Sequence, residues 1–225
     1  MDVVVDPRPL AGQIPAVASK SDAHRLLICA ALADGPTELG LQSLSQDILA
    51  TMNCLKALGA DIRQTAPNRW QIAPIQAPAA SPVLDCGESG STLRFLLPLV
   101  GALGAETAFQ GRGRLPQRPL TQLTEQLEVH GMAFSAPTLP FSASGRLTGG
   151  LFRLPGGVSS QFVTGLLLCG PLLEEGCRVE IEGNMESAPY VYLTVSAMER
   201  FGVAVQTFEN GWQVPPGQAY RSPGS

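Results

Sequence analysis

The sequence predicts an α/β (α+β) domain in which a βαβαββ unit occurs three times around a pseudo-threefold axis, with buried helices inside and sheets outside. Two observations carry this prediction. Amphipathic helical segments end at glycines that are 72 and 71 residues apart, namely Gly59, Gly131 and Gly202. Three other helical segments are apolar on every face, as buried helices are, and residues at the start of these segments recur at an offset of 69, as Arg25 and Arg94 do.

The composition excludes several classes of protein. With 225 residues, 44% hydrophobic and 15% charged, the chain can bury a substantial core and is typical of a globular protein. The net charge of −4 argues against a general nucleic-acid surface. Apolar runs such as 95–105 are shorter than the roughly 18 residues that a membrane helix needs. We therefore expect no nucleic-acid or membrane partner.

The N-terminal residues and the cysteines suggest a cytoplasmic protein. The first residues lack the basic segment and long apolar core of a signal peptide. The five cysteines are an odd number and form no C-x-x-C pair, so we expect unpaired structural thiols among apolar neighbours.

The first unit combines a short run of valines, an apolar helix, a strand, an amphipathic helix and two strands. The amphipathic helix has apolar side chains at spacings of three and four residues and ends before Gly59. Its predicted strands are 3–5, 37–39, 60–64 and 70–72, and its predicted helices are 19–33 and 47–58.

The second and third units repeat this order. Each again has an apolar helix after a serine-containing turn and an amphipathic helix before a glycine. The predicted strands are 83–85, 107–110, 132–134, 151–154, 177–181 and 203–205. The predicted helices are 95–103, 120–127, 162–173 and 191–201. Residues 215–225 are rich in proline and glycine, which is typical of a linker.

The starts of the three apolar helices predict an anion site. A helix N-terminus offers unpaired N–H groups and the positive end of the dipole. If the units pack around one axis, the three N-termini point to one place. The third unit has Val163 where the others have arginine, so this pocket is asymmetric. The side chains expected to gather there are Lys20, Ser21, Arg25, Ser91, Arg94, Ser159, Ser160 and Gln161.

Other motifs predict little chemistry. The segment 87–92 is similar to a phosphate loop but lacks the Gly-Lys-Ser/Thr ending of nucleotide-binding loops. His24 and His130 are expected to pack or to lie on the surface, and no metal-ligand cluster or Ser-His-Asp set is visible. We expect neither a metal nor a cofactor.

Five motifs together resemble the 5-enolpyruvylshikimate-3-phosphate synthase family (3-phosphoshikimate 1-carboxyvinyltransferase). They occur in the family's order along nearly the whole chain. They are Ser19-Lys20-Ser21-x-x-x-Arg25, Gly87-Glu88-Ser89-Gly90-Ser91-Thr92-Leu93-Arg94, Arg118-Pro119, Ser159-Ser160-Gln161 and Ser187-Ala188-Pro189-Tyr190.

The resemblance implies an enolpyruvyl transferase-like fold of two similar domains, each with three βαβαββ units, and transfer of the enolpyruvyl group from phosphoenolpyruvate to the 5-hydroxyl of shikimate 3-phosphate. It implies Lys20 as the catalytic residue. The implied shikimate 3-phosphate ligands are Lys20, Ser21, Arg25, Ser159, Ser160, Gln161, Ser187 and Tyr190. The implied phosphoenolpyruvate ligands are Lys20, Gly90, Ser91, Arg94, Arg118 and Gln161.

The chain departs from the family in length and at two positions. Members of the family are roughly twice as long, so the resemblance implies one half, lacking a C-terminal domain and inactive alone; the full-length protein is expected to be a monomer. Residues 1–14 would hold a strand and crossover that belong with the missing domain, 15–214 the shikimate 3-phosphate-binding domain, and 215–225 a crossover linker. Many relatives have asparagine at Glu88 and proline at Phe95, which leaves sensitivity to glyphosate open.

Two alternative functions stay open. The related UDP-N-acetylglucosamine enolpyruvyl transferase shares the fold, but it is expected to carry asparagine after the first lysine, where Ser21 and Arg25 favour the shikimate enzyme. The other alternative is a module that binds shikimate 3-phosphate without turnover.

Overall fold

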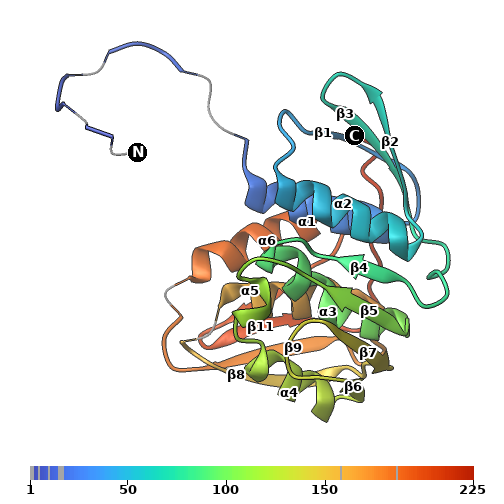
Figure 1. The fold of residues 1–225 in the computed structure, drawn as a ribbon. Coiled ribbons are helices and arrows are strands. Elements are labelled where there is room, and N and C mark those ends of the chain that lie inside the picture. The colour runs from blue at the N-terminus through green and yellow to red at the C-terminus, as the bar shows by residue number, and fades with distance from the viewer. Residues whose placement is uncertain (1–2, 5, 10, 15–17, 158, 186) are drawn as a thin grey trace.

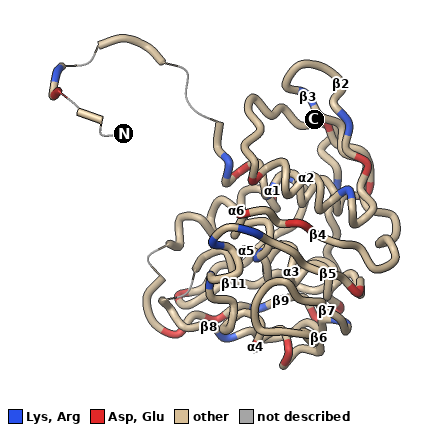
Figure 2. Tube along the Cα trace, viewed as in Figure 1, with Lys and Arg blue, Asp and Glu red and all other residues tan. Residues whose placement is uncertain are grey.

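Three apolar helices form the inside of the molecule, as Figure 1 shows for the computed structural model. The structure describes residues 3–4, 6–9, 11–14, 18–157, 159–185 and 187–225. The apolar helices are α1 (Lys20–Leu32), α3 (Gly90–Leu103) and α5 (Ser160–Cys169). Charged residues lie mainly in the outer elements and loops (Figure 2), and Arg94 is the single charged residue of α3 and α5.

The second and third units have the predicted βαβαββ order. In each, the first strand runs parallel to the second, and an antiparallel hairpin completes a four-stranded sheet. The second unit contains β4 (Val83–Asp85), β5 (Thr107–Gln110), the 3-10 turn η1 (Leu115–Gln117), α4 (Thr121–Val129), β6 (Met132–Phe134) and β7 (Phe141–Gly145). The third contains β8 (Gly150–Pro155), the 3-10 turn η2 (Gly170–Leu172), β9 (Cys177–Glu182), α6 (Ala188–Arg200), β10 (Gln206–Phe208) and β11 (Gly211–Val214). The predicted fold class is therefore confirmed.

The first unit has three strands in its sheet instead of four. Its strands pair antiparallel in the order β1-β3-β2. The elements are β1 (Thr37–Gly40), α2 (Gln46–Leu58), β2 (Asp61–Ala66) and β3 (Arg69–Ala73). The position of the fourth strand, beside β1, is approached by the end of the chain, because Glu38 N–H donates to Gly224 O at 2.9 Å. The equivalent bond in the second unit joins Ala108 N–H to Pro82 O, just before β4.

The two ends of the chain behave differently from each other. Val3 and Val4 are exposed and form no strand, while the rest of that predicted strand, Val5, lies outside the described residues. The described residues before 15 lead away from the body (Figure 1). Residues 215–225 instead pack on the domain: Tyr220 is 2% exposed, and its hydroxyl donates to Leu168 O at 2.8 Å. Their assignment as a crossover linker stays a prediction.

Some element bounds differ from the sequence prediction for clear reasons. The strand predicted at 203–205 lies at Gln206–Phe208 instead, because Val203 N–H bonds to Met198 O and completes the end of α6. The helix predicted to reach residue 173 leaves α-helical geometry at Cys169, since Pro171 has no N–H to continue the ladder. Strand β7 escaped prediction because its interior is Ser-Ala-Ser, without the β-branched residues typical of strands.

The cysteine prediction is confirmed: Cys29, Cys54, Cys86, Cys169 and Cys177 are free and buried. Among the residues that the structure describes, no helix has both the length and the apolar character to cross a membrane. Within the same residues, no group of three or more His, Cys, Asp or Glu side chains is arranged to hold a metal ion.

Candidate functional site

The apolar helices begin in the same way, with a serine at the N-cap. The Ser19 hydroxyl accepts from Asp22 N–H at 3.2 Å, Ser89 from Thr92 N–H at 3.2 Å, and Ser159 from Gln161 N–H at 3.3 Å. Serine is a preferred N-cap because its short side chain satisfies one of the free N–H groups of the first turn. The recurring serines of the sequence are thus explained first by helix capping.

The residues predicted for the site gather around one open cavity of about 410 Å³. It is lined from α1, α3, the loop before α4, the start of α5 and the start of α6. Its lining is Lys20, Ser21, Arg25, Ser91, Arg94, Phe95, Arg118, Ser159, Ser160, Gln161, Ser187 and Tyr190. Every predicted site residue except Gly90 is in this set. Their roles toward a ligand stay predictions.

Gly90 lies against this cavity, and its lack of a side chain has a geometric reason. A Cβ at Gly90 would lie 2.7 Å from Arg118 Nη1 and 3.7 Å from Arg94 Nη1. Glycine therefore lets the Arg118 side chain approach the first turn of α3.

Two other cavities are larger, at about 470 and 590 Å³. They flank α2, one toward β4 and one toward α1, and no fully buried cation lines either of them. The 410 Å³ cavity differs because two buried guanidinium groups line it.

Arg25 is 2% exposed and is held by neutral acceptors. Its Nε donates to Thr194 Oγ1 at 2.8 Å, and Nη2 donates to Thr164 Oγ1 at 3.1 Å and to Tyr190 O at 3.0 Å. Nη1 donates to Ser21 O. Burial lowers the pKa of Arg25 to about 10, so the guanidinium is charged at neutral pH. Among the described residues it has no ion pair with a carboxylate.

Arg94 is 9% exposed and has the same kind of environment. Nη1 donates to Gln161 Oε1 at 2.6 Å and Nη2 to Pro119 O at 3.2 Å, while Nε finds no acceptor among the described residues. Burial, and after it the positive charge of Arg118, lowers the pKa of Arg94. Two cations close together with free donors favour an anion between them.

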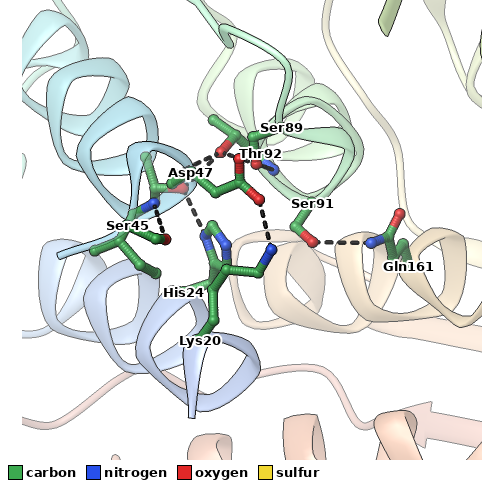
Figure 3. A network of polar contacts seen from close by, with 10 residues as sticks. Lys20, His24, Ser45, Asp47, Ser89, Ser91, Thr92 and Gln161 are labelled. Atoms are coloured by element: carbon green, nitrogen blue, oxygen red, sulfur yellow. Dashed lines mark hydrogen bonds and ion pairs between the residues drawn. The ribbon is translucent and has the colours of Figure 1, made fainter. Parts of the chain in front are cut away.

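Gln161 links two of the helix starts. Its Oε1 accepts from Arg94, and its Nε2 donates to Ser91 Oγ at 2.8 Å (Figure 3). These two contacts determine which way the amide points. The predicted clustering of these residues therefore follows from direct hydrogen bonds between α3 and α5.

Lys20 is paired with a carboxylate that sequence reasoning missed. Its Nζ lies 2.6 Å from Asp47 Oδ2, in the first turn of α2, and the two side chains are 51% and 29% exposed (Figure 3). An acidic residue in the first turn of a helix is ordinary, because it complements the dipole. The sequence around Asp47 thus carried no signal of a partner 27 residues away.

His24 is buried in a chain of hydroxyl groups behind this pair. Its Nδ1 lies 2.7 Å from Thr51 Oγ1, which lies 2.7 Å from Thr92 Oγ1, and Thr92 Oγ1 donates to Ser89 Oγ at 2.8 Å. Nε2 has no partner among the described residues. Burial is the main reason that the pKa of His24 falls to about 4, so its imidazole is neutral at neutral pH. The expected packing role of His24 is confirmed.

The threonines around Arg25 and His24 were also missed. Thr51, Thr164 and Thr194 are fully buried and lie on α2, α5 and α6. Each sits on the inner face of its helix, where a hydroxyl is a less common choice than an apolar side chain. A polar residue at an apolar position was the available signal.

Comparisons with known proteins agree with the fold and the motifs. The family model described as EPSP synthase (3-phosphoshikimate 1-carboxyvinyltransferase) matches residues 4–224. A 3-phosphoshikimate 1-carboxyvinyltransferase of Clostridium kluyveri is 38% identical over 205 residues, which are 90% of this chain and 48% of that protein. One of Methanocorpusculum labreanum is 35% identical over 227 residues, covering 99% of this chain and 54% of the relative.

A solved structure shows the same fold. EPSP synthase from Acinetobacter baumannii superimposes with a TM-score of 0.79 at 24% sequence identity, over 94% of this chain and 48% of the other. The chain therefore spans about half the length of the curated relatives and of the solved structure that it matches.

Proposed function

The chain belongs to the EPSP synthase family, and from this membership we propose that it forms the shikimate 3-phosphate-binding half of an enolpyruvyl transferase. The complete enzyme would transfer the enolpyruvyl group of phosphoenolpyruvate to the 5-hydroxyl of shikimate 3-phosphate. Because the chain covers about half of its relatives, the second half of the active site would come from a partner domain.

The observation that carries this proposal is a pair of buried guanidinium groups without a carboxylate. Arg25 and Arg94 line one cavity, and their acceptors among the described residues are neutral. Shikimate 3-phosphate and phosphoenolpyruvate each carry a phosphate and a carboxylate, and so bring the negative charge that these groups lack. Charge-assisted hydrogen bonds of this kind are roughly twice as strong as neutral ones.

The serines of the site suit a phosphate. Ser160 is the first residue of α5, and Ser159 caps that helix, so hydroxyl and free N–H groups occur at one helix start. Ser187 and Tyr190, at the start of α6, also line the cavity. We assign shikimate 3-phosphate to the serines, Tyr190 and Arg25, and phosphoenolpyruvate to Arg94, Arg118 and Gly90.

The proposed reaction is an addition followed by an elimination. The 5-hydroxyl oxygen attacks carbon 2 of phosphoenolpyruvate and loses its proton, while carbon 3 takes up a proton to become a methyl group. The tetrahedral intermediate then loses inorganic phosphate, and a proton leaves carbon 3 as the double bond forms again. Lys20, the first residue of α1, would stabilise the anionic groups of the reacting molecules.

This half on its own should lack turnover. The side chains near its cavity that could act as acid or base are Asp22, His24, Asp47 and Glu88. The imidazole of His24 is neutral and buried, and Asp47 is paired with Lys20. Proton transfer requires groups positioned next to carbon 3 and the hydroxyl, and closure of two domains would exclude water from them. We therefore assign the missing acid–base groups to the other half.

Titration of the chain with shikimate 3-phosphate, monitored by calorimetry or NMR, tests the binding part of the proposal. Saturable binding that an Arg25→Met variant weakens at least tenfold is expected, with Arg63→Met, an exposed arginine of β2, as the control. Absence of any shift at millimolar ligand would refute it. A phosphate-release assay tests the rest: turnover by the lone chain would contradict the assignment of acid–base groups to the other half.

The same experiments address the other functions. A natural binding module would bind shikimate 3-phosphate and stay inactive when the second half of a relative is added. A UDP-N-acetylglucosamine transferase would bind that sugar nucleotide in preference, but the matching family model and relatives bear the name of the shikimate enzyme.

A further inference from the structure

Each of the two buried guanidinium groups lies over an aromatic ring of the next apolar helix. Arg25 Cζ on α1 is 5.0 Å from the centroid of the Phe95 ring on α3. Arg94 Cζ on α3 is 5.1 Å from the centroid of the Phe162 ring on α5. Both rings are almost fully buried, at 1% and 2% exposure. The same contact thus occurs twice around the pseudo-threefold arrangement of helices.

A buried guanidinium needs compensation for the water that it loses, and a carboxylate is the usual source. Here the hydrogen-bond acceptors are hydroxyls, backbone carbonyls and one amide, and the remaining contact is the face of an aromatic ring. The negative quadrupole of the ring face attracts a cation, more strongly when the pair is away from water. The ring carries no net charge, so it leaves the positive charge of the arginine uncancelled.

Arg178 provides a contrast on the surface. Its Cζ lies 4.6 Å from the centroid of Phe208, but its guanidinium also pairs with the Glu180 carboxylate at 2.8 Å and is 43% exposed. Among the described residues, neither Arg25 nor Arg94 has such a pair. Within the described part of the chain, the aromatic contact without a carboxylate therefore occurs only at the two arginines of the cavity.

We propose that Phe95 and Phe162 are positioning residues of the anion site, which hold the Arg25 and Arg94 guanidinium groups in place through cation–π contacts while leaving their charge for the ligand. This inference rests on the proposed function for the identity of the ligand, and on the two ring contacts for everything else. Phe95 also lines the cavity, so its ring helps to exclude water from Arg25.

The test replaces Phe95 or Phe162 by trifluorophenylalanine, which weakens the ring quadrupole with little change in shape. Phe109 receives the same replacement as the control, because it is fully buried but packs on Phe141, at 5.6 Å between centroids, in the outer sheet. Two quantities are measured in the full 225-residue chain: affinity for shikimate 3-phosphate by calorimetry, and rotation of the Arg25 and Arg94 guanidinium groups by NMR without ligand. A third, the KM for phosphoenolpyruvate, is measured in the complete enzyme made with a second half.

The fluorinated ring at 95 should speed rotation of the Arg25 group, and that at 162 should speed rotation of the Arg94 group. Fluorination at 95 should weaken binding of shikimate 3-phosphate by about tenfold, and fluorination at 162 should raise the KM for phosphoenolpyruvate by about tenfold, each equivalent to ~1.4 kcal/mol. Fluorination at 109 should change none of these quantities. Unchanged rotation at both arginines would overturn the inference, and so would faster rotation with full affinity for shikimate 3-phosphate at 95 and an unchanged KM for phosphoenolpyruvate at 162. If the unmodified chain binds no shikimate 3-phosphate, the proposed function fails, and the rotation measurement still decides whether the rings hold the arginines.

Discussion

Arg25 and Thr194 are 169 residues apart in sequence, yet the Arg25 Nε donates to the Thr194 hydroxyl at 2.8 Å. This bond joins α1, the first helix, to α6, the last one. Thr194 Oγ1 also lies 2.8 Å from Thr164 Oγ1 on α5. One buried hydroxyl therefore connects the first and third units at the cavity.

Replacing Thr194 by valine should destabilise the fold and weaken ligand binding together. Valine has nearly the same shape but leaves the charged Nε without its acceptor, and a hydrogen bond to a charged group contributes ~1.5–3 kcal/mol. Urea unfolding should show a loss of that size, and calorimetry a weaker affinity for shikimate 3-phosphate. Thr207→Val on β10, where the side chain is exposed, is the matched control and should change neither. Equal unfolding free energies for Thr194→Val and wild type would contradict this account.

The gathering of Lys20, Arg25, Arg94 and Gln161 was predictable because local signals and the repeat agree. Each lies in the first turns of an apolar helix, and a threefold arrangement brings such helix starts together. The residues that hydrogen-bond to these side chains were not predictable in the same way. Thr194 and Asp47 are linked to the site by contacts across 169 and 27 residues, and no local pattern relates such positions.

The secondary structure shows the same division. The stop glycines predicted the ends of the amphipathic helices well, because Gly59 and Gly202 adopt the positive φ values of 114° and 77° that glycine accepts easily. The position of strand β10 was predicted wrongly because Val203 is β-branched, as strand residues often are, but its N–H bonds to Met198 O at the end of α6. The bond from Val203 N–H to Met198 O decides this competition between a helix end and a strand.

Lys20 and Lys56 should differ sharply when each is replaced by methionine in a complete enzyme made with a second half. Lys20 lies at the mouth of the cavity beside Asp47, whereas Lys56 is exposed on α2. Loss of a charge that stabilises the reacting anions commonly costs ~3 kcal/mol or more, about a hundredfold in rate. Phosphate release should therefore collapse for Lys20→Met and stay near the parent rate for Lys56→Met. Equal rates for the two variants would refute the placement of Lys20.

His24 should make the free energy of unfolding depend on pH. Its folded pKa is about 4 against an ordinary value of 6.5, so the unfolded chain binds a proton that the folded chain rejects. The contribution is fully present above pH 6.5 and is lost as the pH falls toward 4, by up to ~3 kcal/mol. The measurement is the unfolding free energy in urea at pH 7 and at pH 5, for wild type and for His24→Asn.

Other groups titrate in the same range, so the difference between the two proteins carries the information. The loss of stability between pH 7 and pH 5 should be larger in wild type by ~2 kcal/mol, which is 1.36 kcal/mol per pKa unit over about 1.5 units. An identical loss in both proteins would mean that the imidazole of His24 is not kept neutral by burial.

Gly90→Ala should separate stability from activity. Gly90 is the first residue of α3 and has no positive φ, so alanine suits the backbone and favours the helix by up to ~1 kcal/mol. Its Cβ, however, would meet Arg118 Nη1 at 2.7 Å, so the end of the arginine side chain must shift from its present position. In the complete enzyme the KM for phosphoenolpyruvate should rise about tenfold, which corresponds to ~1.4 kcal/mol of lost binding, while the urea midpoint of the 225-residue chain stays the same or rises.

Gly157→Ala, where nothing lies within 4 Å of the new Cβ, is the control and should leave KM unchanged. A normal KM in Gly90→Ala would show that Arg118 can bind from a displaced position, and the close approach to Gly90 would then have no part in recognition.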